Sequence, residues 1–306
     1  MSRLETFQAQ RARLIGIAYR MLGEMGAAED VAQEAWLRWS KAGDEDIRDP
    51  RAWLSAVTVR LSLDALRKAR ARRETYVGPW LPEPLLPDDM RALAADAPAA
   101  RAELASDLSL ALLLVLERLS PEERAALILH DAFDCDYATI AQTLEKNEAA
   151  CRKLVSRARE RVKAERPRFQ ATPEQHRDLL LRFAQASASG DERAMLDLLA
   201  ADAVAYTDGG GRVAAALNPI YGAGKIARFI VGLGRKFYSG VAVTPELIEI
   251  NGQAGLRIRV GDEMFGVITV ETDGSRITAL YAIRNPDKLT RLSGLGPEHP
   301  AEQRGE

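Results

Sequence analysis

Apolar and small side chains recur at spacings of three and four residues through most of the first half of the chain, which is typical of amphipathic helices with one buried face. This pattern predicts helices at residues 14–22, 28–39, 51–73 and 108–116, and a pair of helices within residues 137–162. The polar, acidic stretch at residues 41–50 has no apolar stripe, and we expect it to be a loop.

The helix pair in residues 137–162 has the character of a DNA-reading helix–turn–helix. Its turn, Glu145 to Asn147, is too polar for a core, and Asn147 is a favoured N-cap for the second helix. Such a helix can lie in the major groove, with its first residues on base edges and its later arginines near phosphates. An ordinary helical hairpin with a solvated basic face is the alternative. The polar side of the second helix is formed by Glu148, Arg152, Lys153, Ser156, Arg157 and Arg159.

Two further segments mark where helices begin and end in the first half of the chain. Ser120 as N-cap, Pro121 at the first position and Glu123 closing a capping box mark a helix start just before the helix pair. Residues 78–98 are rich in proline, so they cannot form one continuous helix and favour extended conformations. We expect this segment to be a linker between two helical bundles.

After residue 173 the pattern changes. Helices are predicted at residues 174–189 and 191–200, and a helix at residues 224–237 interrupts a series of short strands. Helices followed by a mostly antiparallel, curved sheet indicate an α+β domain with one sheet face wrapped on helices. The strands are predicted at residues 204–206, 247–250, 255–260, 264–272 and 277–283.

The net charge of −2 provides no global basic field, but charge is segregated along the chain. Bases outnumber acids in residues 147–170 and acids outnumber bases in residues 24–49, which suggests one anionic and one cationic partner. Cys135 and Cys151 form no CxxC pair and the three histidines have no metal-ligand spacing, so we expect no disulfide, metal or cofactor. No signal peptide or membrane-length apolar run is evident, and we expect a cytoplasmic protein without membrane association.

The acidic second helix carries the first of three motifs that resemble extracytoplasmic-function sigma factors of the sigma-70 family. Residues 28–38 (AEDVAQEAWLR) are similar to the sigma segment that grips the clamp of bacterial RNA polymerase, and an acidic face meeting a basic coiled coil fits the charge pattern. The resemblance implies polymerase-binding roles for Asp30, Gln33, Glu34 and Arg38.

The second and third motifs follow in the order that this family has. Residues 50–54 (PRAWL) and the helix behind them match the segment that meets the minus-10 promoter element, where a base of the nontemplate strand is held unstacked. Residues 119–124 and the helix–turn–helix resemble the module that reads the minus-35 element. Trp53 is expected to be core rather than a stacking platform. The resemblance implies minus-10 contacts by Arg48, Arg60, Asp64, Arg67, Lys68 and Arg70.

The C-terminal part resembles a SnoaL-like domain, a cone-shaped α+β fold, and the chain is similar to the sigma subgroup that carries this fusion (the SigJ-like subgroup). Arg212 stands where that subgroup has lysine after its three glycines. The resemblance implies that the extension regulates the sigma factor in cis by docking on the linker and on the first bundle, with Trp80 as a buried anchor. The interdomain residues would be Trp80, Leu81, Pro82, Glu83, Pro84, Asp208, Gly209, Gly210, Gly211, Asn285, Pro286, Asp287, Lys288 and Leu289.

These observations predict a multidomain protein with two all-α sigma domains, the second with the helix–turn–helix, and a C-terminal α+β SnoaL-like cone. The expected boundaries are residues 1–75 for sigma region 2, 76–105 for the linker, 106–168 for sigma region 4, 172–290 for the extension and 291–306 for a mobile tail. The implied partners are core RNA polymerase, through its clamp and flap, and promoter DNA. A small-molecule ligand of the extension stays open.

Two alternatives remain at this stage. One is a helix–turn–helix regulator that binds promoters without core polymerase. The other is a ligand-binding or enzymatic SnoaL-like domain fused to a DNA-binding module, for which Asp208 and Asp262 are the only acid–base candidates. No Tyr/Asp or His/Asp constellation is evident, and we expect a transcription initiation factor rather than an enzyme.

Overall fold

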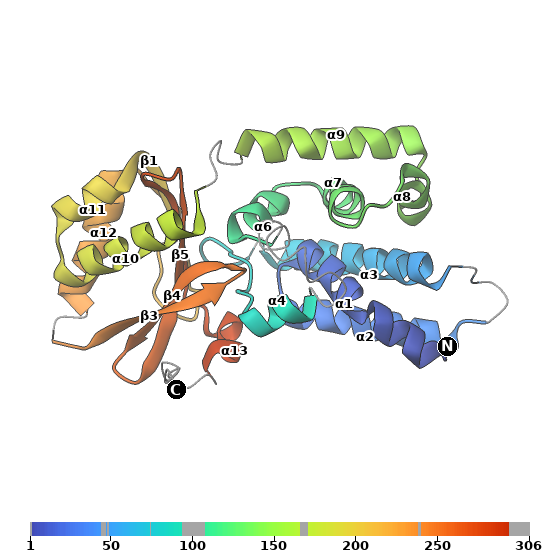
Figure 1. Cartoon of the computed structure of the whole chain (residues 1–306), viewed down its shortest axis with the longest axis horizontal. Helices are drawn as coiled ribbons and strands as arrows, with labels where there is room; N and C mark the ends of the chain where they lie inside the picture. The colour runs from blue at the N-terminus through green and yellow to red at the C-terminus, as the bar shows by residue number, and fades with distance from the viewer. Residues whose placement is uncertain are drawn as a thin grey trace, which may run out of the picture.

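The computed structural model describes residues 2–43, 47, 49–73, 75–93, 108–165, 171–237 and 240–293. The predictions that concern Arg48, the side chain of Arg70, the middle of the linker and the tail beyond residue 293 lie outside these residues. Figure 1 shows the helical elements of the first half on one side and the sheet with its helices on the other.

The first three helices form a bundle: α1 (Arg3–Leu22), α2 (Met25–Lys41) and α3 (Pro50–Arg73). A capping box at Ser2 starts α1, and Gly23 ends it in the left-handed conformation (φ 71°) that glycine adopts without steric cost. The predicted apolar stripe of α1 is its buried face, where Leu14 and Ile17 have no exposed surface. Trp53 packs at the edge of this core with its ring centroid 5.5 Å from that of Trp39.

The linker contains the short helix α4 (Pro87–Leu93). A second helical group follows it: α6 (Leu110–Glu117), α7 (Pro121–Leu127), a π-helical turn (Ile128–Ala132), α8 (Tyr137–Leu144) and α9 (Glu148–Glu165). The predicted capping box at Ser120 and Glu123 is confirmed. Asn147 caps α9 as predicted, since its Oδ1 accepts a hydrogen bond from the Ala150 amide at 2.8 Å. Buried residues of α1–α3 and of α6–α9 form one continuous apolar core.

The C-terminal half combines helices α10 (Pro173–Ser189), α11 (Glu192–Leu198) and α12 (Ala223–Phe237) with a six-stranded sheet. The strand order is β2-β1-β6-β5-β4-β3, with β1 and β6 parallel and the other pairs antiparallel. A 3-10 turn (Pro286–Lys288) and α13 (Thr290–Ser293) follow the last strand. The strands are β1 (Leu199–Asp208), β2 (Ile220–Tyr221), β3 (Val243–Ile250), β4 (Gln253–Val260), β5 (Glu263–Thr272) and β6 (Ile277–Ile283).

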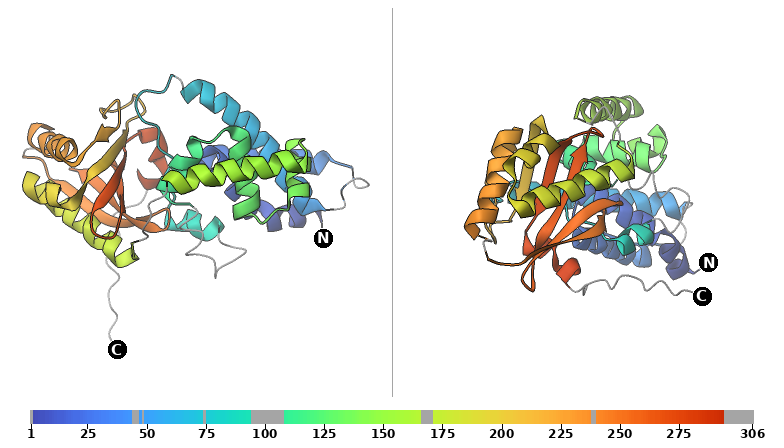
Figure 2. Two further views of the ribbon diagram at one scale, coloured as in Figure 1. Left: turned by 90° about the horizontal axis from the view of Figure 1, so that it is seen from above. Right: turned by 60° about the vertical axis from the view of Figure 1, so that its left-hand side comes forward.

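The two faces of the sheet bury different partners, because alternate side chains of a strand point to opposite faces. Leu280 and Ala282 of β6 pack with α10–α12, whereas Tyr281 and Ile283 pack with Leu81 of the linker and with α6. Figure 2 shows the sheet lying between its own helices and the helical half of the chain. The second face is therefore an interdomain surface.

Two predicted boundaries need correction, and one strand was not predicted. The sequence predicts helix up to residue 200, but β1 begins at Leu199, because pairing with Ile277 of β6 overrides the helix propensity of the alanine-rich run. β3 begins at Val243 rather than at residue 247, since Pro245 interrupts the apolar pattern and is tolerated on an edge strand. The short β2 has no signal in the sequence.

Candidate nucleic-acid interface and interdomain contacts

The four residues expected to bind polymerase lie on α2. Asp30, Gln33 and Arg38 are exposed. Glu34 pairs with Arg38 one helical turn later, at 3.1 Å. The side chains recur at spacings of three and four, so they share one helix face. The structure thus brings the four predicted residues together on an accessible, mixed-charge surface.

Arg60 of α3 does not point freely into solvent. Its guanidinium donates to the backbone oxygens of Gln142 and Thr143, each at 3.2 Å, and lies 3.8 Å from the Glu145 carboxylate. These carbonyls belong to the last turn of α8, where a helix leaves its acceptors unsatisfied and carries partial negative charge. A residue expected on promoter DNA therefore caps a helix of the other bundle.

The remaining minus-10 candidates in the described part of α3 are accessible. Asp64 and Arg67 form an exposed ion pair at 3.1 Å, and Lys68 is exposed. Exposed pairs of this kind contribute about 0–1 kcal/mol and are screened by salt, so they do not hold the helix in place. These side chains lie further along α3 than Arg60, away from the α8 contact in sequence.

The candidate minus-35 residues line the outer side of α9, which runs along the top of Figure 1. Lys153 and Arg157 are exposed, and Arg152 pairs with Glu148 at 2.7 Å while its guanidinium lies 5.0 Å from the centre of the Tyr137 ring. The Ser156 hydroxyl donates to the Glu160 carboxylate at 3.3 Å, and the Arg159 guanidinium donates to the Asp131 carboxylate at 2.5 Å.

Arg159 is tied to the turn before α8. Burial acts to raise the pKa of Asp131, but the hydrogen bonds and charges of Arg159 and His130 together outweigh burial, and the pKa lies below its ordinary value. Asp131 is therefore an anion that orients Arg159. Cys151 is fully buried on the opposite side of α9, as a small residue of the core.

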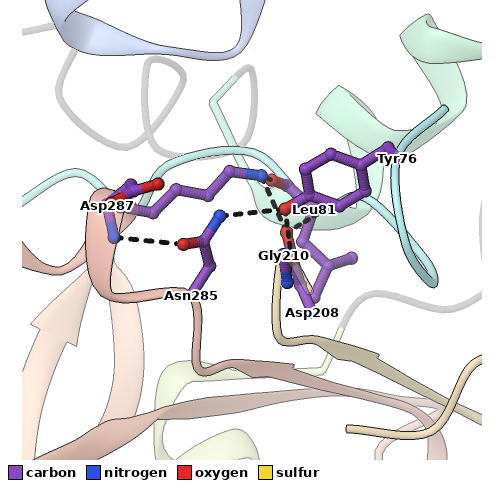
Figure 3. A network of polar contacts seen from close by, with 7 residues as sticks. Tyr76, Leu81, Asp208, Gly210, Asn285 and Asp287 are labelled. Carbon is purple, nitrogen blue, oxygen red and sulfur yellow. Dashed lines mark hydrogen bonds and ion pairs between the residues drawn. The ribbon is translucent and has the colours of Figure 1, made fainter. Parts of the chain in front are cut away.

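A buried polar cluster joins the linker to the extension around Asp208, the last residue of β1. The Asp208 side chain has no exposed surface and accepts from Lys288 Nζ at 2.7 Å, from the Tyr76 hydroxyl at 2.5 Å and from the Leu81 amide at 2.9 Å. Lys288 also donates to the Leu81 carbonyl, and Asn285 donates to the Tyr76 hydroxyl at 2.9 Å (Figure 3). Burial raises the pKa of Tyr76, which stays a neutral donor.

The three glycines after Asp208 are required by close contacts. Gly210 has a φ of 61°, and a Cβ there would lie 2.3 Å from the Asn285 amide nitrogen. Arg212, the departure from the subgroup pattern, forms an exposed ion pair with Asp287 at 3.2 Å. The Gly-rich loop and the residues after β6 therefore pack directly on one another.

Trp80 differs from its prediction as a buried anchor, because it is only partly buried. Its indole packs against Gly23, where a Cβ would lie 2.5 Å from the ring, and Lys288 Nζ lies 4.2 Å from the ring centre. The four residues after it, Leu81 to Pro84, are buried, and Leu81 has no exposed surface. An aliphatic side chain such as that of Leu81 gains most from complete burial.

Glu83 joins the linker to the first bundle. Its carboxylate accepts from the Met25 amide at 2.7 Å, and its own amide donates to the Gly23 carbonyl at 2.8 Å. Burial raises the pKa of Glu83 above its ordinary value although the Met25 amide opposes this. The bond also satisfies one of the orphan donors at the start of α2.

Some contacts were missed by reasoning from sequence. Arg118, at the end of α6, donates to the Tyr206 hydroxyl of β1 at 3.4 Å and pairs with Glu165 of α9 at 2.7 Å. Leu110 of α6 is buried against the same sheet face. The extension thus contacts the second bundle as well as the linker and first bundle. The long apolar run at residues 108–116 was the sequence signal that this helix has a second apolar partner besides its own bundle.

Family models and relatives agree with these motifs. The model described as sigma-70 region 2 matches residues 6–72, and the model described as sigma-70, region 4 matches residues 109–162. Together with full-length relatives that are named as ECF sigma factors, these matches show that the chain belongs to the sigma-70 family as a sigma factor of the extracytoplasmic-function class. It is therefore a transcription initiation factor rather than an enzyme.

The chain is similar over almost its whole length to the Mycobacterium tuberculosis protein named ECF RNA polymerase sigma factor SigJ, with 40% identity covering 93% of this chain and 92% of the relative. The probable ECF RNA polymerase sigma factor SigI of the same organism is 32% identical over 94% of each chain. The crystal structure of M. tuberculosis SigJ matches with a TM-score of 0.72 and 35% identity, covering 94% of this chain and 98% of that one.

The alternatives gain nothing from these findings. A regulator that works without core polymerase has no support among the relatives, which are named as sigma factors. Asp208 is committed to the buried cluster, and Asp262 is exposed in the β4–β5 turn. In the described ranges, no helix is long and apolar enough to cross a bilayer, and no three potential metal ligands gather.

Proposed function

We propose that the structure is the closed state of a sigma factor whose C-terminal extension controls promoter engagement in cis. The observation that carries this is the Arg60 contact: the helix for the minus-10 element is bonded to α8 of the bundle for the minus-35 element. Elements centred about 25 base pairs apart lie on the order of 80 Å apart along B-DNA. The single core shared by both bundles must therefore separate before both elements are bound.

Each surface has a role in this proposal. The α2 face with Asp30 and Glu34 would bind the polymerase clamp, and its exposure in the closed state means that docking can precede opening. Arg60, Arg67 and Lys68 would hold the minus-10 strand, the α9 residues would read minus-35 DNA, and the second bundle would contact the polymerase flap. A cytoplasmic location follows from these partners.

The extension would hold the linker and the two helical bundles together within one chain. It contacts the linker through Asp208 and Lys288, the first bundle through Arg291, which lies 3.6 Å from Glu29, and the second bundle through Arg118. Because the contact is intramolecular, modest affinity suffices to keep the chain closed. A small-molecule effector would shift the balance only by binding one arrangement more tightly than the other.

The test is transcription in vitro with purified bacterial core polymerase, comparing the full chain with a chain that ends at Ala171. We expect both to initiate from a promoter with suitable minus-35 and minus-10 elements, and the two to differ in yield at least severalfold. No transcript with either chain would contradict sigma activity. Equal yields at every polymerase and sigma concentration would contradict regulation in cis.

A further inference from the structure

The turn between β3 and β4 is buried, although turns of this kind normally lie in solvent. Asn251 and Gly252 form a two-residue hairpin turn with φ values of 52° and 77°, the combination that favours Asn-Gly. Asn251 is only 1% exposed. Hairpin geometry explains the residue types at the two positions, but not why the tip is buried.

Every polar group of the Asn251 side chain that can bond is engaged across this contact. Its Oδ1 accepts from the Leu85 amide at 3.0 Å, and its Nδ2 donates to the Leu108 carbonyl at 2.7 Å and to the Tyr19 hydroxyl at 3.2 Å. Its backbone amide donates to the Leu85 carbonyl at 2.9 Å. Both amide hydrogens of Nδ2 are used, so the residue has no donor to spare.

The three partners of Asn251 come from three places in the chain. Tyr19 belongs to α1, Leu85 precedes α4, and Leu108 directly precedes the second bundle. Tyr19 is fully buried, and its hydroxyl donates onward to the Glu83 carbonyl at 2.7 Å. One side chain of the extension therefore holds α1, the linker at Leu85 and the start of the second sigma domain at Leu108, which are 23 positions apart in sequence (108 − 85).

This contact is separate from the cluster around Asp208. That cluster reaches the linker at Tyr76 and Leu81, before the segment that contacts the first bundle through Glu83. Asn251 engages the linker after Glu83 and the start of the second sigma domain at Leu108. The predicted interdomain residues at 80–84, 208–211 and 285–289 include none of the partners of Asn251.

We propose that the tip of the β3–β4 hairpin is the joint that couples the extension to the spacing of the two sigma bundles. Asn251 holds Leu85 and Leu108 close to one another and to α1, and it must release Tyr19, Leu85 and Leu108 before the two bundles can separate. This inference rests on the closed state proposed above and names the residue through which the extension would hold it. The occupant of the joint is this chain's own linker.

Two substitutions probe the joint from opposite sides in the full-length chain. Asn251→Asp keeps the hairpin, since Asp-Gly suits the same turn, and keeps the acceptor for the Leu85 amide. It turns the donor that faces the Leu108 carbonyl into a carboxylate oxygen, which repels that carbonyl. Tyr19→Phe removes only the hydroxyl and leaves the extension unchanged. Asp262→Asn, at the exposed β4–β5 turn, is the matched control.

The measurement is amide hydrogen exchange at Leu85, whose N–H is bonded to Asn251. We expect exchange about tenfold or more faster in Asn251→Asp and about threefold or more faster in Tyr19→Phe, with Asp262→Asn like the parent. Amides in the β5–β6 ladder report whether the extension stays folded. If Asn251→Asp unfolds the extension, Tyr19→Phe decides the outcome.

Parent-like exchange at Leu85 in Tyr19→Phe, or equal acceleration in the control, would overturn the joint. Exchange is measured on the free protein without polymerase, so this result is independent of the transcription test. If the transcription test shows no regulation in cis but Leu85 exchanges faster in Tyr19→Phe than in the parent, the proposed function is disproved and the joint stands. The reverse combination would disprove the joint alone.

Discussion

Replacing Asp208 by Asn should open the contact between the extension and the linker. The substitution keeps the shape of the side chain and an oxygen for the Leu81 amide, but removes the charge that faces Lys288. The Lys288 side chain is 6% exposed and that of Asp208 is fully buried. In Asp208→Asn the ammonium would keep the Leu81 carbonyl and the Trp80 ring as partners and would lose its counter-ion.

The magnitude follows from the burial of the pair. Removing one partner of a buried ion pair costs about 3–5 kcal/mol, because the other charge is left uncompensated. The partners that Lys288 retains place the expected cost near the lower limit, about 3 kcal/mol, which corresponds to roughly a hundredfold loss in the closing equilibrium. Replacing both residues, as in Asp208→Asn with Lys288→Met, removes the stranded charge, and such replacements are often near neutral.

A double-mutant cycle in urea measures this coupling. Unfolding of the parent, the two single variants and the double variant gives an interaction free energy that cancels effects common to each substitution. Limited proteolysis of the linker in the same four proteins reports whether the loss appears as opening rather than as global unfolding. We expect both single variants to be cleaved faster and the double variant to recover part of its protection.

The reasoning would be refuted by a coupling energy below about 0.5 kcal/mol, the range of independent sites. It would also be refuted if Asp208→Asn were as stable and as resistant to cleavage as the parent. Either result would mean that the neutral hydrogen bonds, rather than the ion pair, hold the extension on the linker.

Three further predictions follow from the same contacts. Gly23→Ala should lower the free energy of unfolding in urea by about 1–3 kcal/mol, because of backbone strain at its positive φ and the clash of the new Cβ with Trp80. Gly190→Ala is the control, since Gly190 has a similar φ and open space around it and should show the strain alone. Equal losses in the two variants would mean that the Trp80 contact does not contribute. Because burial raises the pKa of Glu83, its protonated form favours the closed state. Protection of the linker amides from hydrogen exchange should therefore be greatest below the ordinary glutamate pKa and should decline as the pH rises through the higher pKa of the folded state. Glu83→Gln should abolish this dependence, and protection that increases with rising pH would contradict it. Arg60→Ala should reduce the salt dependence of holoenzyme–promoter binding by about 0.7 in the log–log slope, as expected for one lost single-strand phosphate contact; an unchanged slope would assign Arg60 to the closed state only.

Local patterns predicted much of the helical half. The apolar periodicity of α3 predicted the ends of this helix to within a residue. Ser120 and Asn147 cap the helices for which they were predicted. Both predictions were possible because caps and amphipathic faces depend on residues close in sequence. The motif residues Leu81, Asp208 and Lys288 could be grouped by resemblance, and the structure brings them within hydrogen-bonding distance. Their roles in regulation stay predictions.

Contacts between distant segments could not be predicted in this way. Asn251-Gly252 reads as an ordinary hairpin turn, and nothing local shows that its tip is inserted between Tyr19 and Leu108. Helical periodicity likewise shows which side of α3 is apolar, but not that Arg60 finds the carbonyls of α8. Such contacts depend on how whole elements pack, and tertiary packing is not encoded at fixed spacing.

The pairing of β1 with β6 has a consequence for the newly made chain. The first strand of the extension is parallel to its last strand, and Lys288 follows that last strand directly. About 120 residues separate the end of α9 from this lysine, so at 5–20 residues per second the ribosome needs roughly 6–24 s to add them. For that interval a nascent molecule contains both helical bundles but not the complete extension, so under the proposed regulation each new chain would lack the extension's restraint until Lys288 has been added.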